Sequence, residues 1–288
     1  MHLVTGATGN AGSAVVRALV AAGQPVRALV RDGRDGSLPE GAEPVVGELN
    51  RPETFTDALD GVGAIFLLSG YDRTDELLAA AREAGVERVV LLSSSAAPGG
   101  DTSNAVARYH IESERLVRES GLAWTFLQPN SFMSNVFRWL PQLTDGDVVR
   151  LPFADVAVAM IDPDDLGAVA AAALTRTGHD GKAYRLSGPE PLRPAEQVAI
   201  VAAVLGRDVR FEPQRDDEAR EEMGRAMPEE YVDAFFNFFA EGAVDESEVL
   251  PTVEAIVARP PRSLADWAEV HAEALQRAAT AEAGLSRI

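Results

Sequence analysis

Short aliphatic runs alternate with amphipathic stretches through the first half of the chain. The runs are rich in Val, Leu, Ile and Ala, which is typical of strands buried on both faces of a parallel sheet. They lie at 2–5, 26–31, 44–47, 63–69, 87–93 and 123–128. The pattern therefore predicts parallel strands, each of which needs a crossover helix to reach the next one.

Helical periodicity fills the gaps between these runs. It covers 10–22, 52–59, 73–84 and 104–120. Pro52 stands where a first-turn proline is favoured, and Gly85 and Gly121 stand where helices commonly end. The first half is therefore predicted to be a Rossmann-type α/β fold, a doubly wound parallel sheet with helices on both faces.

The pattern loosens after Pro129, where aromatic residues gather. The elements predicted beyond it are regular structure near 156–161, a strand at 183–187, a helix at 194–205, a short strand at 208–212 and helices over 214–279. The strand at 183–187 is expected to extend the sheet. We therefore expect a domain over 1–150 and a smaller α/β part over 151–288 that is interleaved with it.

A glycine-rich turn joins the first predicted strand to the first predicted helix. In this context the first glycine allows a tight turn, the second lets the backbone approach a diphosphate, and the third lets the helix pack closely on the strand. A helix N-terminus also attracts negative charge. The candidate dinucleotide-binding residues of this turn are Gly6, Thr8, Gly9, Asn10, Ala11 and Gly12.

Composition removes several other classes. With 45 acidic residues against 26 basic ones, the net charge of −19 disfavours nucleic-acid binding. The chain has no cysteine, and its four histidines show no ligand spacing, so no metal site is expected. No apolar stretch approaches the roughly 20 residues of a membrane span, and no signal peptide is recognisable. We expect a cytoplasmic protein that binds a small molecule.

Further segments accompany the glycine turn, at 27–32, 61–66, 93–95, 120–125, 181–190 and 205–207. Together with the turn they resemble the NmrA-like family of atypical short-chain dehydrogenase/reductases. The resemblance spans nearly the whole chain. It implies an NAD(P)-binding Rossmann domain over 1–150, a substrate-binding part over 151–288, and an activity similar to that of NAD(P)H:quinone oxidoreductases.

Arg31 ends the second predicted strand, where a guanidinium can pair the 2′-phosphate of NADP(H). We therefore expect NADP(H). NAD(H) is the alternative if Asp32 binds the ribose hydroxyls and Arg31 is only a surface arginine. The family resemblance assigns Glu48 and Leu49 to the adenine, and Ser69, at the end of the fourth strand, is expected beside the nicotinamide ribose.

The chain lacks the Tyr-x-x-x-Lys pair of ordinary short-chain dehydrogenases, because its only lysine is Lys182. His110 and Glu114 fall on one face of a predicted helix and resemble the His-x-x-x-Glu arrangement of NmrA-like quinone reductases. This pair either holds an imidazole for proton delivery or is a surface pair. Tyr109 is a second candidate donor, and Ser93 is expected near the cofactor and the substrate carbonyl.

The segment after the sixth strand is expected to line a substrate pocket. Its candidate substrate-binding residues are Asn130, Phe132, Met133, Trp139 and Phe153. Aromatic side chains here make a flat apolar pocket suited to a quinone, unless they belong to the core. Gln128 stands where the family usually has arginine, which favours a neutral substrate, and the phenylalanines of 235–239 fit a core, a lid or an oligomer contact.

These features predict an NADPH-dependent reductase that transfers a hydride to a quinone or another planar aromatic acceptor, an aromatic polyketide among them. The chief alternative is an NAD(P)-sensing regulator that binds a protein partner without turnover. A third hypothesis is a cofactor-independent scaffold or tailoring protein in a pathway. Association into a homodimer is compatible with each of them.

Overall fold

The computed structural model of the protein describes residues 1–31 and 38–280, and the chain divides into two compact units. The sheet unit comprises 1–129, 163–186 and 251–259, and the smaller unit comprises 130–162, 187–250 and the described residues from 260 onward. The sequence placed a boundary after residue 150. The structure instead places 130–150 in the smaller unit and returns two later segments to the sheet unit, because a strand and two helices of these segments pack there.

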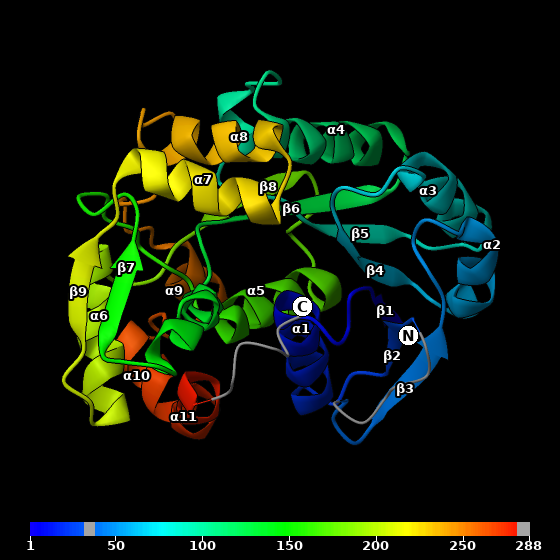
Figure 1. Ribbon diagram of the computed structural model, residues 1–288. Coiled ribbons are helices and arrows are strands. Elements are labelled where there is room, and N and C mark those ends of the chain that lie inside the picture. The colour runs from blue at the N-terminus through cyan, green and yellow to red at the C-terminus, as the bar shows by residue number, and fades with distance from the viewer. Residues whose placement is uncertain (32–37, 281–288) are drawn as a thin grey trace. The chain divides into compact units, whose positions relative to one another are not determined.

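A parallel sheet forms the centre of the sheet unit, with the strand order β3-β2-β1-β4-β5-β6-β8 (Figure 1). Its strands are β1 (His2–Val4), β2 (Val26–Val30), β3 (Ala42–Val46), β4 (Ala64–Leu68), β5 (Arg88–Leu92), β6 (Ala123–Pro129) and β8 (Lys182–Leu186). All the strands predicted for the first half are confirmed, and the strand expected at 183–187 pairs with β6. The chain order reverses between β1 and β4, and open α/β sheets bind ligands at such a switch point.

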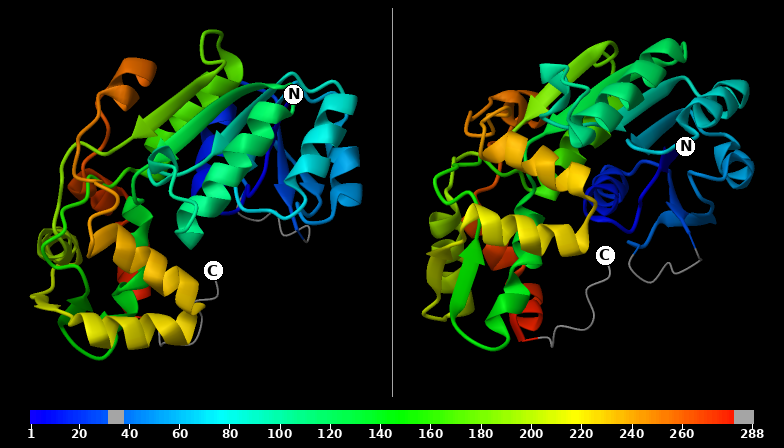
Figure 2. Two further views of the ribbon diagram at one scale, coloured as in Figure 1. Left: turned by 90° about the horizontal axis from the view of Figure 1, so that it is seen from above. Right: turned by 45° about the horizontal axis from the view of Figure 1, so that its top comes forward.

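Helices cover both faces of this sheet, as predicted. They are α1 (Asn10–Ala21), α2 (Pro52–Phe55), α3 (Thr74–Glu83), α4 (Ala105–Glu119), α5 (Pro163–Thr175) and α9 (Thr252–Val257), with the 3₁₀ helices η1 (Thr56–Leu59) and η2 (Ala97–Gly99). Figures 1 and 2 show α1 and α5 together on one face and α3 and α4 on the other. The sheet is therefore doubly wound.

Alternate residues of the strands belong to opposite faces. Odd-numbered strand residues share one core with α3 and α4, namely Leu3, Leu29, Ile65, Leu67, Val89 and Leu91. The residues between them, such as Val4, Phe66 and Val90, are also fully buried. Burial on both faces explains why these strands read as continuous apolar runs rather than as alternating patterns.

Helices α1 and α5 approach each other very closely. A Cβ atom added at Gly167 of α5 would lie 2.6 Å from the carbonyl carbon and 2.7 Å from the carbonyl oxygen of Ala14 in α1. Arg17 and Asp164 form an ion pair of 2.6 Å between the same two helices. Only glycine can occupy this crossing point without moving a backbone.

The smaller unit contains most of the helices of the second half and a two-stranded parallel sheet. Its elements are η3 (Met133–Arg138), η4 (Leu140–Leu143), β7 (Val148–Leu151), α6 (Pro194–Leu205), β9 (Arg210–Pro213), α7 (Asp216–Ala226), α8 (Glu229–Phe239), α10 (Leu264–Val270) and α11 (Ala272–Thr280). The helix predicted at 194–205 is confirmed, and the strand predicted at 208–212 is β9. Its partner β7 has no counterpart in the sequence analysis.

The expectation of regular structure at 156–161 is corrected by the structure. This segment forms no strand or helix and takes part only in isolated bridges, between Val158 and Leu192 and between Phe132 and Ile161. Its apolar residues are buried because the segment crosses the core of the smaller unit as an extended chain, with Val158 and Met160 in contact with that core. The burial of this segment, with only isolated bridges to its neighbours, therefore explains its strand-like apolar pattern.

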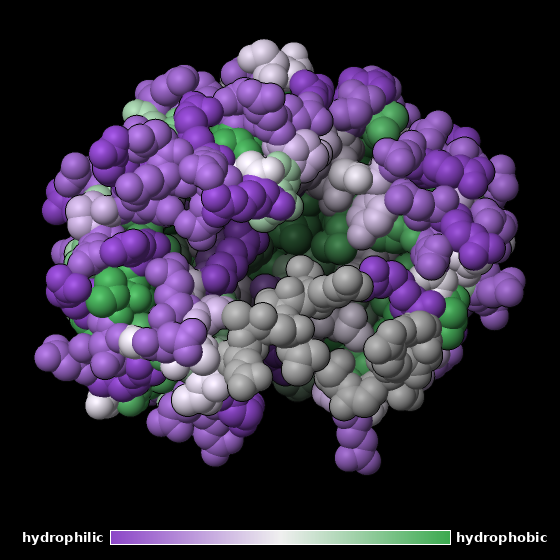
Figure 3. Space-filling view, in the orientation of Figure 1, coloured by the Kyte–Doolittle hydropathy of each residue, from purple (hydrophilic) through white to green (hydrophobic). Residues whose placement is uncertain are grey.

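Hydrophilic residues cover most of the face of the molecule that Figure 3 shows, in keeping with the strongly acidic composition. Within the described ranges, no helix combines the length and the apolar character that crossing a lipid bilayer requires.

We expect substitution by alanine to have opposite effects on stability at Gly167 and at Gly224, because only Gly224 has space for a Cβ atom. Gly167→Ala should lower the free energy of unfolding by about 1–3 kcal/mol, since its methyl group has no space between α1 and α5. Gly224→Ala in α7, where a Cβ atom meets nothing within 4 Å, should raise it by about 0.5–1 kcal/mol through helix propensity. Urea titrations of the three proteins measure both effects, and equal midpoints would contradict the assigned close contact.

Candidate active site

The glycine turn after β1 has a shape that side chains would prevent. Gly6 has a φ of +60°, and a Cβ atom there would lie 2.5 Å from Cδ1 of Leu68 at the end of β4. A Cβ atom at Gly12 would lie 2.1 Å from the carbonyl oxygen of Gly6. The first turn of α1 is therefore drawn tightly onto the end of β1.

The middle of the same turn is open. Thr8, Gly9 and Asn10 are exposed. Helix α1 begins at Asn10, with Gly9 as its N-cap residue, and no side chain caps its first amides. The amide of Gly9 itself donates to the carbonyl of Gly6 at 2.9 Å. A helix start with free backbone N–H groups and little steric cover fits the diphosphate of a dinucleotide.

The ends of β1, β4 and β5 are joined by side-chain hydrogen bonds. The amide of Leu68 donates to Oγ1 of Thr5 at 3.2 Å, and the hydroxyl of Ser69 donates to the carbonyl of Leu92. The amide of Gly70 donates to Oγ of Ser113 in α4 at 3.1 Å. Ser69 thus lies at the expected edge of the sheet, but its hydroxyl proton is used within the protein.

Ser93 is committed to a buried carboxylate. It is only 3% exposed, and its Oγ donates to Oε1 of Glu114 at 2.6 Å. Nε2 of Gln128 donates to the same oxygen at 2.8 Å, and Arg118 donates to Oε2 at 2.8 Å. Gln128, which stands where the family usually has arginine, is therefore a buried partner of Glu114.

The expected pairing of His110 with Glu114 is replaced by these three donors. Burial lowers the pKa of His110 from its ordinary value of 6.5 to about 3, and its Nδ1 has no hydrogen-bond partner among the described residues. Its imidazole is therefore neutral at physiological pH and holds no acidic proton to deliver. A carboxylate beside the imidazole would have kept the pKa of His110 near neutrality. That contact is absent because Glu114 accepts from Ser93 and Gln128 instead.

Tyr109 lies next to His110 and closes on the end of β4. The centroids of the two rings are 4.2 Å apart. A Cβ atom at Gly70 would lie 3.1 Å from Cδ2 of Tyr109, so the ring rests directly on the Gly70 backbone. Tyr109 therefore lies at the carboxyl end of β4, beside the Ser69–Gly70 backbone.

The residues expected around the adenosine part of the cofactor differ in exposure. Arg31 and Glu48 are exposed, whereas Leu49 is buried in the core beside α2 and α3. Leu49 can therefore offer a ligand only its backbone. Asp32, the alternative ribose partner, lies outside the described residues. Across the described ranges no group of three or more His, Asp or Glu side chains is arranged to hold a metal ion.

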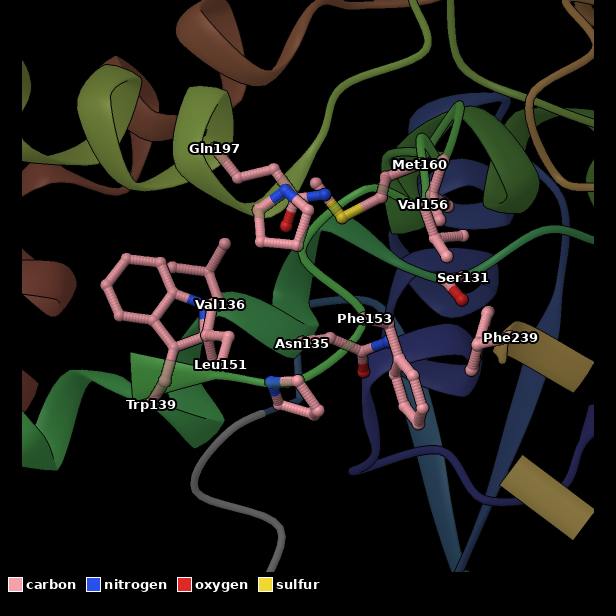
Figure 4. A pocket seen from close by; sticks show the side chains of 13 residues that line it. Ser131, Asn135, Val136, Trp139, Leu151, Phe153, Val156, Met160, Gln197 and Phe239 are labelled. Carbon is pink, nitrogen blue, oxygen red and sulfur yellow. The ribbon is translucent and has the colours of Figure 1, made fainter. Parts of the chain in front are cut away.

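The smaller unit contains an apolar cavity of about 190 Å³ (Figure 4). Its lining residues are Ser131, Asn135, Val136, Trp139, Leu151, Pro152, Phe153, Val156, Val158, Met160, Pro194, Gln197 and Phe239. None of them is charged. In the view of Figure 4, Trp139, Val136 and Leu151 lie toward one side, and Phe153, Ser131 and Phe239 lie toward the other.

Two of the five predicted pocket residues, Trp139 and Phe153, line this cavity. The other three do not. Asn130 is 2% exposed and donates to the carbonyls of Glu246 and Ala159, at 2.9 and 3.3 Å. Met133 is buried in the core of the smaller unit, and Phe132 pairs with Ile161. The hydrogen bonds of Asn130 and the burial of Met133 therefore keep these side chains away from the cavity that Ser131, Asn135 and Val136 line.

Phe153 holds an unusual backbone conformation at the cavity wall. Its φ is +55°, a value that costs a bulky residue roughly 1–3 kcal/mol. Its ring contacts two rings of α8, with centroid distances of 5.0 Å to Phe236 and 5.4 Å to Phe239. These contacts offset the strain and fix the ring in place.

A model of the NmrA-like family matches residues 2–270 of the chain. The chain belongs to this family. It is also 41% identical, over 95% of its length and 99% of the relative, to a (4-alkanoyl-5-oxo-2,5-dihydrofuran-3-yl)methyl phosphate reductase of Streptomyces griseus subsp. griseus. An NAD(P)H azoreductase of Xenophilus azovorans is 37% identical over 95% of this chain and 99% of its own.

Solved structures of other reductases share the fold of this NmrA-like protein. An NADPH-dependent quinone oxidoreductase of Escherichia coli superposes with a TM-score of 0.78 at 22% identity, covering 94% of this chain and 99% of that one. The triphenylmethane reductase of a Citrobacter species, complexed with NADP(H), has a TM-score of 0.75 at 25% identity over the same shares. The predicted family, fold class and oxidoreductase class are confirmed.

Sequence reasoning missed part of the NmrA-like protein's cavity. Ser131 and Gln197 were not predicted as pocket residues. Phe239 was assigned, with the other phenylalanines of 235–239, to a core, a lid or an oligomer contact. Gln197 and Phe239 come from α6 and α8, far along the chain from Trp139, and no local pattern distinguishes a cavity-facing helix residue from a core residue. Ser131 carried a weak signal, since it is the second residue after the end of β6.

The lowered pKa of His110 predicts an acid-sensitive contribution to stability. Between pH 6.5 and about 3 the unfolded chain binds a proton that the folded protein excludes, so stability falls as the pH falls through this window. His110→Phe removes this contribution, which is at most about 1.4 kcal/mol for each pH unit. Urea titrations at pH 7.5 and 5.0 should show a smaller loss for the variant, and equal losses would contradict the burial of this imidazole.

Proposed function

We propose that this protein is an NADPH-dependent reductase that transfers a hydride to a flat, uncharged aromatic acceptor, a quinone in the first instance. The observation that carries the proposal is the glycine turn at the switch point between β1 and β4, where a Cβ atom at Gly12 would meet the backbone at 2.1 Å and no side chain caps the first amides of α1. Its relatives are named as reductases of quinones, azo compounds and triphenylmethane dyes, which supports the same chemistry here.

The residues of the sheet unit fit the parts of an NADP(H) molecule. The first amides of α1 would hold the diphosphate, which would pass close to the Gly9 backbone, and Arg31 would pair the 2′-phosphate. The end of β4 at Ser69 and Gly70 would bind the nicotinamide ribose through its backbone. The bound nicotinamide supplies a hydride; the protein's part is to bind, orient and exclude water.

The cavity of the smaller unit favours an uncharged planar acceptor. Trp139, Phe153 and Phe239 offer aromatic faces for stacking, and the lining carries no charge to balance a phosphate or carboxylate. An aromatic polyketide ring satisfies these conditions as a quinone does. The strained Phe153 pre-organises one wall, so little ordering is needed when a flat ring enters.

Tyr109 is the proton donor that we favour among the three catalytic candidates. The hydroxyl of Ser93 is held by Glu114, and His110 is neutral. The ring of Tyr109 rests on Gly70 at the edge where the nicotinamide ribose is expected. A phenol can protonate the reduced acceptor oxygen as the hydride arrives at the ring.

The decisive experiment follows the loss of NADPH absorbance with a panel of quinones and azo dyes. Gly9→Ala is the test variant, because Gly9 has φ −87° and ψ 174° and a Cβ atom there would make only an ordinary contact of 3.4 Å. The variant should fold normally and lose cofactor affinity by at least about tenfold, since its methyl group stands in the diphosphate path. Gly63→Ala, at a position with open space, is the matched control.

Other outcomes separate the alternatives. Tight NADPH binding without turnover of any acceptor would favour the sensor, and a protein partner captured only with the cofactor would support it further. If calorimetry shows no binding of NADPH or NADH, both the reductase and the sensor are rejected.

Arg31→Ala tests the choice of nucleotide. The variant should raise the KM for NADPH about tenfold, the cost of one charge-assisted contact, and leave the KM for NADH nearly unchanged. Steady-state kinetics with both nucleotides measure this, and an equal effect on the two would assign Arg31 to the protein surface.

Neighbouring substitutions in α4 test the proton donor. Tyr109→Phe should lower kcat for a quinone by about 100-fold, at the low end of general acid catalysis, with little change in the KM for NADPH. His110→Phe should leave kcat at pH 7.5 within about twofold, because its imidazole is already neutral. The reverse ranking would return the role to His110.

A further inference from the structure

The polar side chains of the cavity are few and uncharged, so the direction of each hydrogen bond decides what the cavity can recognise. Ser131, Asn135 and Gln197 are the polar members of an otherwise apolar lining (Figure 4). The side-chain amide of Asn135 has no hydrogen-bond partner among the described residues, so it can donate to a carbonyl or accept from a hydroxyl. The other two are constrained by the protein.

Ser131 is held by a buried carboxylate that the predicted chemistry did not include. Its Oγ donates to Oε2 of Glu246 at 2.7 Å, and its backbone amide donates to the same oxygen at 3.1 Å. Glu246 is 8% exposed, and its backbone carbonyl accepts from the amide of Ala159 at 2.7 Å and from Asn130 at 2.9 Å. Both ends of Glu246 are therefore fixed to the segment that lines the cavity.

The hydroxyl proton of Ser131 is consequently directed away from any ligand. A carboxylate accepts a serine proton more strongly than a neutral oxygen does, so Oγ offers the cavity only its lone pairs. Gln197 is held in place as well, because its Nε2 donates to the carbonyl of Leu192 at 2.9 Å, but it keeps its second N–H and its amide oxygen for other partners. Oγ of Ser131 is thus the polar atom of the lining that can only accept from a ligand.

We propose that this cavity selects aromatic ligands that carry a hydroxyl or N–H donor, with Ser131 as the acceptor and Glu246 as the positioning residue. This inference rests on the proposed function, since it names the substrate class of the same cavity. The ligand's ring would stack on the aromatic wall, and its donor would bond to Oγ of Ser131. A ring of equal size without a donor would leave this polarised oxygen unpaired.

The test compares 6-(hydroxymethyl)-1,4-naphthoquinone with 6-ethyl-1,4-naphthoquinone, which have nearly the same size and differ in one donor. Calorimetry on the full chain without NADPH measures both affinities, so no turnover is required. The chain has no cysteine that a quinone could alkylate. The preference for the hydroxymethyl compound should fall about fivefold in Ser131→Ala, which is the worth of one hydrogen bond, and should persist in Ser131→Thr.

Further variants complete the design. Ser103→Ala, at an exposed serine of the sheet unit, should leave the preference unchanged. Glu246→Gln, whose amide can donate to Ser131, should reduce it. An equal preference in the wild type and Ser131→Ala would overturn the proposal, and an unchanged preference in Glu246→Gln would overturn the part of Glu246. If the wild-type protein binds these ligands as expected but turns over no acceptor with NADPH, the reductase proposal is rejected and the binding proposal stands.

Discussion

The close contact between the start of α1 and the turn after β1 is the constraint on which the cofactor site depends. Gly12 has no space for a side chain against the carbonyl of Gly6, and Gly6 has none against Leu68. The turn therefore brings the open amides of α1 to the ends of β1 and β4. Because α5 lies equally close to α1 at Gly167, the helix is held from two sides. The position of the amides follows from packing rather than from any side chain that could bind a phosphate.

Two buried carboxylates organise the polar groups near the proposed chemistry. Glu114 gathers Ser93, Gln128 and Arg118 in the sheet unit, and Glu246 gathers both donors of Ser131 in the smaller unit. A buried carboxylate is stable only when donors satisfy it, so each one determines which protons its neighbours can still offer. This is why a serine at a strand end is not by itself a proton donor. For the same reason, Oγ of Ser131 can only accept a hydrogen bond from a ligand, because its proton is donated to Glu246.

The cavity combines a strained residue with a neutral lining. Phe153 keeps a positive φ because its ring packs on Phe236 and Phe239 of α8. Stacking surfaces supply most of the affinity for a flat ring, whereas the few polar groups decide which ring is accepted. The reductase named for a phosphate-bearing substrate is 41% identical to this chain, and yet no lining residue of this cavity is cationic. Family membership therefore defines the oxidoreductase class, and the proposed choice of acceptor rests on the lining.

The sequence by itself determined the strands of the sheet unit, its helices up to residue 120, the glycine turn and the family, because apolar periodicity and glycine spacing are local signals that the chain carries in order. It did not show that Glu114 turns to Ser93 instead of His110, that Asn130 and Met133 face the core, or that Ser131, Gln197 and Phe239 meet at one cavity. Those outcomes depend on contacts between segments far apart in the chain. Burial then decides which polar atoms are satisfied, and no short stretch of sequence contains that information.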